Sequence, residues 1–273
     1  MAGLINKENN KHIKLSKLTL NKVLVIYMDN TKKTLKVIFN ALDKSGIEYS
    51  AIPRTHKSSN VFRNKDLIIT VGGDGTFLGA AHYIKDTPVL AVSPDELKHE
   101  GFFARANRFN FEQKFKKIIS GKHKILYLQR LYAKINNKPV EHSLNEIYAG
   151  KRRAYLLSKY SIKVGNKSEY QKSSGVLIGT AAGSYAWIKA CGGKILPLNS
   201  KKFQFVVREP FTGRFLRYKM LKKVLEQNEV ITLISKMKRG VVIADSVGKE
   251  YSFSNGDILT IRVSKHPLRL VAF

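Results

Sequence analysis

The stretch Leu67–Thr76 has the sequence LIITVGGDGT, and it decides the fold. Its first half, Leu67–Val71, has the length and the apolar, β-branched composition of a buried strand. The three glycines that follow allow the backbone to turn sharply and to approach a ligand closely. Thr76 and the apolar residues of Phe77–Ile84 predict a helix directly after the turn. A strand, a glycine turn and a helix N-terminus together are typical of a phosphate-binding site.

Asp74 places a negative charge inside this anion-binding turn. A carboxylate there repels phosphate unless it holds a metal ion or takes a proton from a hydroxyl group. Phosphoryl transfer needs such a carboxylate, one that deprotonates an alcohol beside bound phosphates. The alternative is an ordinary Asp-Gly turn after a strand. The turn is not a Walker loop, because no Gly-Lys-Ser/Thr follows, and it is not a GxGxxG dinucleotide motif.

The residues around this motif predict strands and helices in alternation. Strands are predicted at Lys22–Tyr27, Ile47–Ile52 and Pro88–Val92, and amphipathic helices at Thr31–Ser45 and Phe109–Ser120. Such alternation indicates βαβ units and a mostly parallel, Rossmann-like sheet.

The pattern changes near residue 123, where short strand-like runs separated by turn signals begin. The predicted strands are Lys124–Ile135, Leu157–Val164, Gly175–Gly179, Gln204–Arg208, Val230–Ile234, Val241–Ala244 and Ile258–Val263. We therefore predict an α/β domain over residues 1–125, with residues 1–21 as a loose lead-in. A β-sandwich domain is predicted over residues 126–258.

Composition limits the class of protein. The chain has 273 residues, 43% of them hydrophobic, which is enough for two domains with real cores. No apolar run approaches the roughly 20 residues of a membrane helix, and the single cysteine, Cys191, excludes an intramolecular disulfide. We expect a cytoplasmic protein that does not bind membranes. The net charge of +29 favours anionic partners such as nucleotides, polyphosphate or nucleic acid, or it reflects a lysine-rich solvated surface.

Several ordered motifs resemble one family. Gly72–Thr76 resembles the GGDGT motif of NAD kinases and of the lipid kinases related to diacylglycerol kinase. The continuation into Phe77–Ala81 is similar to the NAD kinases. Further segments resemble the NAD kinases in order, and two of them are closest to the mitochondrial-type branch: Ser93–Phe103 (SPDELKHEGFF), Leu144–Glu146, Ser173–Trp187 (SSGVLIGTAAGSYAW), Cys191–Gly193 and Ala244–Ser246.

The resemblance implies roles for the glycine turn. Asp74 would be the general base that deprotonates the adenosine 2′-hydroxyl of NAD, so that this oxygen attacks the γ-phosphate of the donor. The neighbouring residues would hold the phosphates of the donor or of NAD, mainly through backbone amides: Gly72, Gly73, Gly75, Thr76 and Phe77.

The resemblance also implies an NAD site in the β domain. Asn145 and Glu146 carry an amide and a carboxylate suited to an adenine edge and ribose hydroxyls, although such a pair can also cap a turn. Most relatives have Asp at the position of Ser174. Asp245 is either part of this site or part of a hairpin turn, and Trp187 is either a ligand wall or a core residue. The other expected site residues are Thr180, Ser184, Tyr185 and Ala186.

Cofactors and partners follow from the same resemblance. Mg²⁺ would arrive with ATP or polyphosphate, because no metal-ligand spacing is visible in the sequence. The sequence does not single out His99, His266, Lys189 or Arg208, which are site candidates by residue type alone. We expect a homodimer or homotetramer, and residues 259–273 should return to the first domain. Two alternatives stay open: a lipid kinase, or an inactive homologue that binds polyanions. Nucleic acid is the less favoured partner, because no RNP1-type motif is present.

Overall fold

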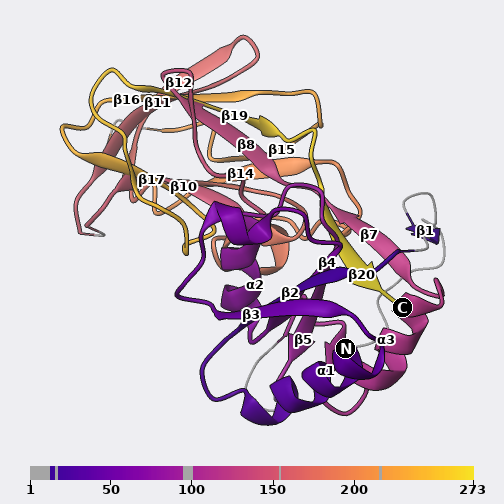
Figure 1. Cartoon of the computed structure of the whole chain (residues 1–273). Helices are drawn as coiled ribbons and strands as arrows, with labels where there is room; N and C mark the ends of the chain where they lie inside the picture. Colours follow the sequence, from indigo (N-terminus) through magenta and orange to yellow (C-terminus); the bar gives the residue numbers. More distant parts are fainter. Residues whose placement is uncertain (1–12, 16–17, 95–100, 154, 215–216) are drawn as a thin grey trace. The chain divides into compact units, whose positions relative to one another are not determined.

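The computed structural model describes residues 13–15, 18–94, 101–153, 155–214 and 217–273. The chain divides into two compact units, one formed by residues 1–127 and 268–273 and the other by residues 128–267. Figure 1 shows the elements of both units in chain order. The predicted combination of an α/β region and a β-sandwich is confirmed.

The first unit is built on one mostly parallel sheet with the strand order β1-β7-β20-β5-β4-β2-β3, and β6 pairs with β5. Its strands are β1 (Ile13–Leu15), β2 (Lys22–Tyr27), β3 (Glu48–Pro53), β4 (Leu67–Val71), β5 (Val89–Ser93), β6 (Ala106–Asn107), β7 (Lys124–Leu128) and β20 (Leu268–Ala272). Every residue of β4 and β5 is buried, as expected of central strands that are covered on both faces.

Helices cover both faces of this sheet: α1 (Lys32–Lys44), α2 (Asp74–Ala81), α3 (Phe111–Ile119) and the short 3-10 helix η2 (Ser59–Phe62). Helices α1 and α3 lie side by side on one face, and α2 lies on the other (Figure 1). The buried residues of α1 recur at helical spacing, from Leu35 through Ile38 to Leu42. The helix ends where Gly46 adopts a φ of +64°, a conformation that favours glycine.

The prediction of the α2 start was wrong by a few residues. The helix begins at Asp74 instead of Thr76 or Phe77, and Gly73 is its N-cap. The reason is that the Gly73 carbonyl accepts hydrogen bonds from the amides of Thr76 and Phe77, which closes the first turn early. Asp74 therefore lies in the first helical turn, where a negative charge is stabilised by the helix dipole.

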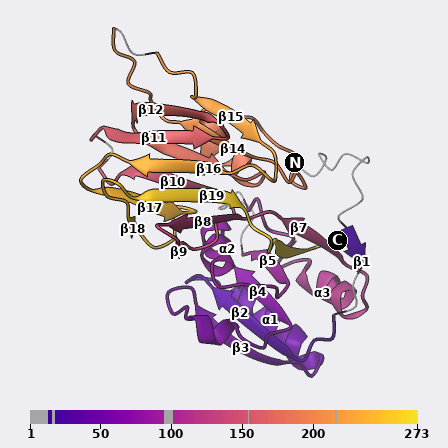
Figure 2. The same cartoon turned by 90° about the horizontal axis from the view of Figure 1, so that it is seen from above.

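The second unit contains two antiparallel six-stranded sheets, β15-β14-β13-β10-β17-β18 and β12-β11-β16-β19-β8-β9 (Figure 2). The first sheet comprises β10 (Glu146–Lys151), β13 (Val176–Gly179), β14 (Phe203–Val207), β15 (Lys222–Leu225), β17 (Gly240–Ala244) and β18 (Tyr251–Ser252). The second comprises β8 (Leu131–Ile135), β9 (Lys138–Pro139), β11 (Ser158–Val164), β12 (Lys167–Ser173), β16 (Ile231–Ser235) and β19 (Ile258–Val263). Short helices η3 (Gly183–Tyr185) and α4 (Trp187–Ala190) follow β13.

A hydrophobic core joins the two sheets of this unit. Ile147, Ile178 and Phe205 contribute from one sheet, and Ile162 and Leu259 from the other. Burial alternates strictly along β11, so one face of the strand packs and the other is more exposed. This arrangement is the predicted β-sandwich.

Two predicted boundaries need correction. The single strand expected at Lys124–Ile135 is two strands, of which β7 belongs to the first sheet and β8 to the second unit. The returning segment begins at Leu268 instead of residue 259, because β19 pairs with β16 and β8 inside the second unit. Strand β20 then lies parallel to β5, with Leu270 opposite Val89.

Candidate active site

The glycine turn lies at the carboxyl end of β4, where open α/β sheets bind their ligands. Gly72 is required by a close approach, because a Cβ atom there would lie 2.5 Å from Thr76 Oγ1. Gly75 is exposed, and a Cβ atom there would meet nothing within 4 Å. At Gly75, the backbone of the first turn of α2 is therefore exposed and not covered by any side chain, so an anion can approach it.

The amide groups of the turn divide into two sets. Gly72 donates to the Val92 carbonyl, and Thr76 and Phe77 donate to Gly73. These three amides donate within the fold, and their contact with phosphate stays a prediction. Gly73 and Gly75, with Asp74 between them, are the part of the turn whose amides stay suited to that role.

Asp74 is held by two backbone donors. Its Oδ2 accepts the N–H of Phe102 and its Oδ1 accepts the N–H of Phe103, each at 3.0 Å. The Phe103 ring stacks on Phe77 of α2, with the ring centroids 4.6 Å apart. Each carboxylate oxygen keeps lone-pair capacity for a further donor. The carboxylate is therefore fixed in place and still able to accept a proton.

Arg105 supports this segment. Its guanidinium donates to the carbonyls of Phe102 and Ala104, at 3.0 and 2.9 Å. Burial lowers the pKa of Arg105, and the negative charge of Asp74 opposes that shift. Sequence reasoning missed these partners of Asp74, because two of them are backbone amides and have no side-chain signature. Residues 95–100 of the Ser93–Phe103 segment, including His99, lie outside the described residues.

Two buried hydroxyl groups lie at the same edge of the sheet. Thr76 Oγ1 and Ser93 Oγ have no hydrogen-bond partner among the described residues, although Thr76 is 1% and Ser93 4% exposed. A buried hydroxyl without a partner costs free energy, so a ligand that supplies one is favoured.

In the second unit, Asp245 organises the turn that carries Asn145 and Glu146. Its Oδ1 accepts hydrogen bonds from Ser143 Oγ at 2.6 Å, the Asn145 amide at 2.6 Å and the Glu146 amide at 3.3 Å. Its Oδ2 accepts the Leu144 amide at 2.9 Å. Asp245 itself is 2% exposed and has a φ of +54°. Its carboxylate therefore supports the turn, and direct contact of Asp245 with NAD stays a prediction.

Asn145 and Glu146 present unsatisfied oxygens. Asn145 Oδ1 and Glu146 Oε2 are buried and have no hydrogen-bond partner among the described residues. Burial, and then the negative charge of Asp245, raise the pKa of Glu146 to about 8, while a contact with Ser246 acts in the opposite direction. At neutral pH Glu146 is mostly protonated, so it offers both a hydroxyl donor and an acceptor.

Thr180 and Ser184 use their hydroxyls inside the protein. Thr180 Oγ1 donates to the Leu144 carbonyl at 2.6 Å, and Ser184 Oγ donates to Ala181 at 2.6 Å and accepts the Leu196 amide at 2.9 Å. A Cβ atom at Gly183 would lie 2.0 Å from the Asn145 carbonyl oxygen, so this segment packs directly on the Asn145 turn.

Three further predicted residues, Tyr185, Ala186 and Trp187, follow on the same segment. Tyr185 is 39% exposed and Ala186 is also exposed. Trp187 is half-buried beside Tyr148 and Arg208. Its ring stacks on the Tyr148 ring with the ring centroids 5.8 Å apart, and the central carbon of the Arg208 guanidinium lies 4.8 Å from the Trp187 ring centroid. Sequence reasoning did not assign Tyr148 a role.

Ser174 contributes its backbone to this neighbourhood. Its carbonyl accepts the Tyr148 hydroxyl at 3.1 Å, and its amide donates to the Arg208 carbonyl at 3.0 Å. Ser174 is therefore joined by backbone hydrogen bonds to Tyr148 and Arg208.

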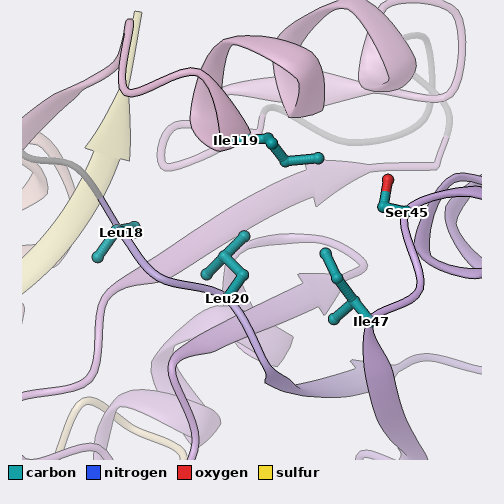
Figure 3. A pocket seen from close by; sticks show the side chains of 5 residues that line it. All are labelled: Leu18, Leu20, Ser45, Ile47 and Ile119. Atoms are coloured by element: carbon teal, nitrogen blue, oxygen red, sulfur yellow. The ribbon is translucent and has the colours of Figure 1, made fainter.

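Metal sites, membrane helices and pockets can also be sought among the described residues. They contain no group of three or more His, Cys, Asp or Glu placed to hold a metal ion. No helix among them is long and apolar enough to cross a membrane. A small hollow in the first unit is lined by Leu18, Leu20, Ser45, Ile47 and Ile119 (Figure 3). It lies where β2 and β3 begin, at the amino ends of strands that bind ligands at their carboxyl ends.

The fold, an α/β unit with a glycine turn and a β-sandwich unit, is that of a class of phosphotransferases. A family model of the ATP-NAD kinase N-terminal domain matches residues 6–123. An NADH kinase of Arabidopsis thaliana is 34% identical over 254 residues, which cover 84% of this chain and 80% of the relative. A probable NADH kinase of Oryza sativa subsp. japonica is 28% identical over 278 residues, which cover 92% and 85%.

A solved structure shares the fold. The crystal structure of an NAD kinase from Archaeoglobus fulgidus in complex with ATP has a TM-score of 0.76 and 23% identity, over 91% of this chain and 92% of that chain. The chain belongs to the NAD kinase family, a family of phosphotransferases. The GGDGT motif alone does not distinguish NAD kinases from lipid kinases, and the similarity to NADH kinases over most of the chain decides between them for this chain.

Proposed function

We propose that the chain transfers the γ-phosphoryl group of ATP to the adenosine 2′-hydroxyl of NAD, giving NADP and ADP. The observation that carries the proposal is the Asp74 carboxylate, which is fixed by the amides of Phe102 and Phe103 in the first turn of α2. A carboxylate held at the end of a phosphate-binding turn is suited to receive the proton of an attacking hydroxyl.

The proposed step balances without a covalent enzyme intermediate. The 2′-oxygen forms a bond to the γ-phosphorus, the hydroxyl proton passes to Asp74, and the bond to the β,γ-bridging oxygen breaks to release ADP. The amides at Gly73 and Gly75 and the positive end of α2 stabilise the charge on the phosphates. Proton release from Asp74 to solvent completes the cycle, since the residue is partly exposed.

We propose Mg²⁺ as the cofactor, carried by the phosphate oxygens of the donor. Mg²⁺ is usually bound through substrate phosphates and water with only one or two carboxylates, so a donor with several phosphate groups can bring the ion with it. When bound, Mg²⁺ neutralises phosphate charge and so lowers the barrier to attack by an oxygen nucleophile.

In the second unit, we propose that Asn145 and Glu146 recognise the nucleoside of NAD. Their unsatisfied oxygens, Asn145 Oδ1 and Glu146 Oε2, suit the amino and hydroxyl donors of adenosine. The Arabidopsis relative is named an NADH kinase and the Oryza relative a probable NADH kinase, so the reduced coenzyme is the second acceptor to test. ATP bound to the Archaeoglobus relative makes ATP the first donor to test, ahead of polyphosphate.

The test is an incubation of the purified protein with Mg²⁺ and each pairing of NAD or NADH with ATP or polyphosphate. NADP or NADPH is measured with a dehydrogenase that accepts only the phosphorylated coenzyme. Asp74→Asn is the matched control, because it keeps the side-chain shape and removes the base. Absence of product with every pairing would refute the proposal and favour the inactive polyanion-binding homologue.

We also propose that the protein works as a homodimer or homotetramer. Sedimentation equilibrium at micromolar concentration measures this directly, and a monomer alone would contradict it.

A further inference from the structure

Lys57 is a partly buried cation that the sequence did not single out. It follows β3, close to the carboxyl edge of the sheet at which the glycine turn also lies. A Cβ atom at Gly79 would lie 2.5 Å from Lys57 Nζ, so the ammonium group packs directly on the backbone of α2. Any larger residue at position 79 would displace it.

The segment that carries Lys57 is held in place at its C-terminal end by an aromatic contact. Phe62, in η2, is buried and stacks on Tyr83, just beyond the end of α2, with the ring centroids 5.0 Å apart. Lys57 is thus held between the end of β3 and this stacked pair. Its position over Gly79 follows from packing and does not depend on a charged partner.

The charges around Lys57 are unfavourable without a ligand. Burial lowers the pKa of its ammonium group, and the positive charge of Arg54 lowers it further. Among the described residues, no carboxylate forms an ion pair with Lys57. Lys57 is partly buried against the α2 backbone and has the exposed cation Arg54 near it, so an anion bound beside Lys57 would stabilise its charge. The arrangement is therefore that of an anion site that the fold leaves incomplete.

The glycines of α2 indicate how an anion bound at Lys57 would be oriented. Gly75 and Gly79 are four residues apart and share one helix face, about 6 Å apart along the axis. The Gly75 end is open and lies beside the Asp74 carboxylate, and the Gly79 end is covered by Lys57 Nζ. An anion with several linked charges can contact the free amides at one end of this face and the ammonium group at the other.

We propose that Lys57, supported by Arg54, binds the phosphate chain of the phosphoryl donor along the Gly75–Gly79 face of α2. The assignment rests on the proposed kinase function for the identity of the donor, and the chemistry recognised is a linked di- or triphosphate. Lys57 is a binding and positioning residue, and Asp74 is the base.

The test compares Lys57→Met with Lys65→Met. Lys65 is a matched control, because it is also partly buried in the first unit and its ammonium group donates to a neutral hydroxyl, Ser50 Oγ, at 3.3 Å. The probes are inorganic tripolyphosphate and ATP, each titrated calorimetrically with the whole protein. Loss of a charge-assisted contact should weaken binding of both by about 10-fold or more in Lys57→Met.

Kinetics give a second readout. In Lys57→Met, the KM for the donor should rise by a similar factor while the KM for NAD stays unchanged, and Lys57→Arg should restore part of the loss. Tripolyphosphate should raise the unfolding temperature of the wild type more than that of Lys57→Met. If Lys57→Met does not fold, Lys57→Gln replaces it in the same measurements.

The outcomes separate this inference from the proposed function. Equal effects in Lys57→Met and Lys65→Met, or no binding of tripolyphosphate by the wild type, overturn the anion site. A wild type that makes NADP with a donor KM unaffected by Lys57→Met also overturns it and leaves the kinase function standing. A wild type that makes no NADP but binds tripolyphosphate through Lys57 refutes the kinase function and supports the site.

Discussion

Asp74 in the first unit and Glu146 in the second are both carboxyl groups at candidate binding positions, and their surroundings are opposite. Asp74 is partly exposed, begins a helix and accepts two backbone N–H groups. Glu146 is 4% exposed, and burial and the neighbouring charge of Asp245 raise its pKa to about 8. Burial thus favours the protonated form of Glu146, whereas the Asp74 carboxylate keeps access to solvent and two backbone donors.

Among the tests of this comparison between Asp74 and Glu146, substitution of Asp74 should have the largest effect. Asp74→Asn keeps the side-chain shape and an acceptor for one of the two backbone amides of Phe102 and Phe103, but it removes the base, so turnover should fall by about 100- to 10,000-fold. Binding of NAD should change little, because this substitution does not alter the groups around Asn145. Steady-state kinetics and equilibrium dialysis with NAD measure the two quantities. Turnover that stays near the wild-type rate would remove Asp74 from the mechanism.

The next largest effect is expected at Asp245. Asp245→Ala leaves the amides of Leu144, Asn145 and Glu146 without their buried acceptor, which should lower the free energy of unfolding by about 3 kcal/mol or more. Asp66 is the control, because its Oδ2 also accepts two backbone amides, each at 2.8 Å, but these amides can bond water instead. Urea unfolding of Asp66→Ala should show a loss of about 1 kcal/mol or less. Equal losses would mean that burial does not distinguish the two carboxylates.

Glu146 gives a pH signature. Its pKa is raised in the folded state from 4.5 to about 8, so the protonated side chain adds stability that is complete below about pH 4.5 and is lost as the pH rises to 8. Glu146→Gln mimics the protonated form and should remove this dependence. Relative to that variant, the wild type should lose about 1 kcal/mol of unfolding free energy per pH unit between pH 5 and 8.

Urea unfolding of both proteins at several pH values measures this difference. Parallel curves for the wild type and Glu146→Gln would show that Glu146 titrates normally. Asp245→Asn refines the result, since loss of the neighbouring negative charge should lower the pKa of Glu146 and move the sloping range to lower pH.

The sequence predicts local structure well where the residues that determine a strand, turn or helix lie within one short segment. Leu67–Thr76 predicts the strand, the turn and the helix, because apolar run, glycines and helix start are adjacent. The alternation of apolar and polar residues in Leu157–Val164 likewise predicts β11. The helix start was misplaced because a glycine N-cap is a backbone property that apolar periodicity does not reveal.

The sequence predicts partners poorly where a contact joins distant backbone groups. The amides that fix Asp74 come from residues 102 and 103, and those that surround Asp245 come from residues about 100 positions earlier. The sequence does not single out Lys57 for a related reason, since the role proposed for it depends on the absence of a side chain at Gly79. Residue type shows which groups can react, and the fold decides which of them are held, buried or left unsatisfied.

The smallest effect is expected from the net charge of +29, which acts over the whole surface and on neither carboxyl group in particular. Long-range attraction raises the encounter rate with an anionic donor, and salt screens it over about 10 Å at 0.1 M. Adding salt up to about 0.5 M should therefore lower kcat/KM for ATP several-fold and leave kcat nearly constant, because the contacts proposed for the bound donor act at short range and are screened little. Stopped-flow and steady-state assays across a salt series measure both. A fall in kcat as large as the fall in kcat/KM would mean that surface charge acts on the chemical step, and a flat response in both would leave the lysines as a solvated surface without a role in encounter.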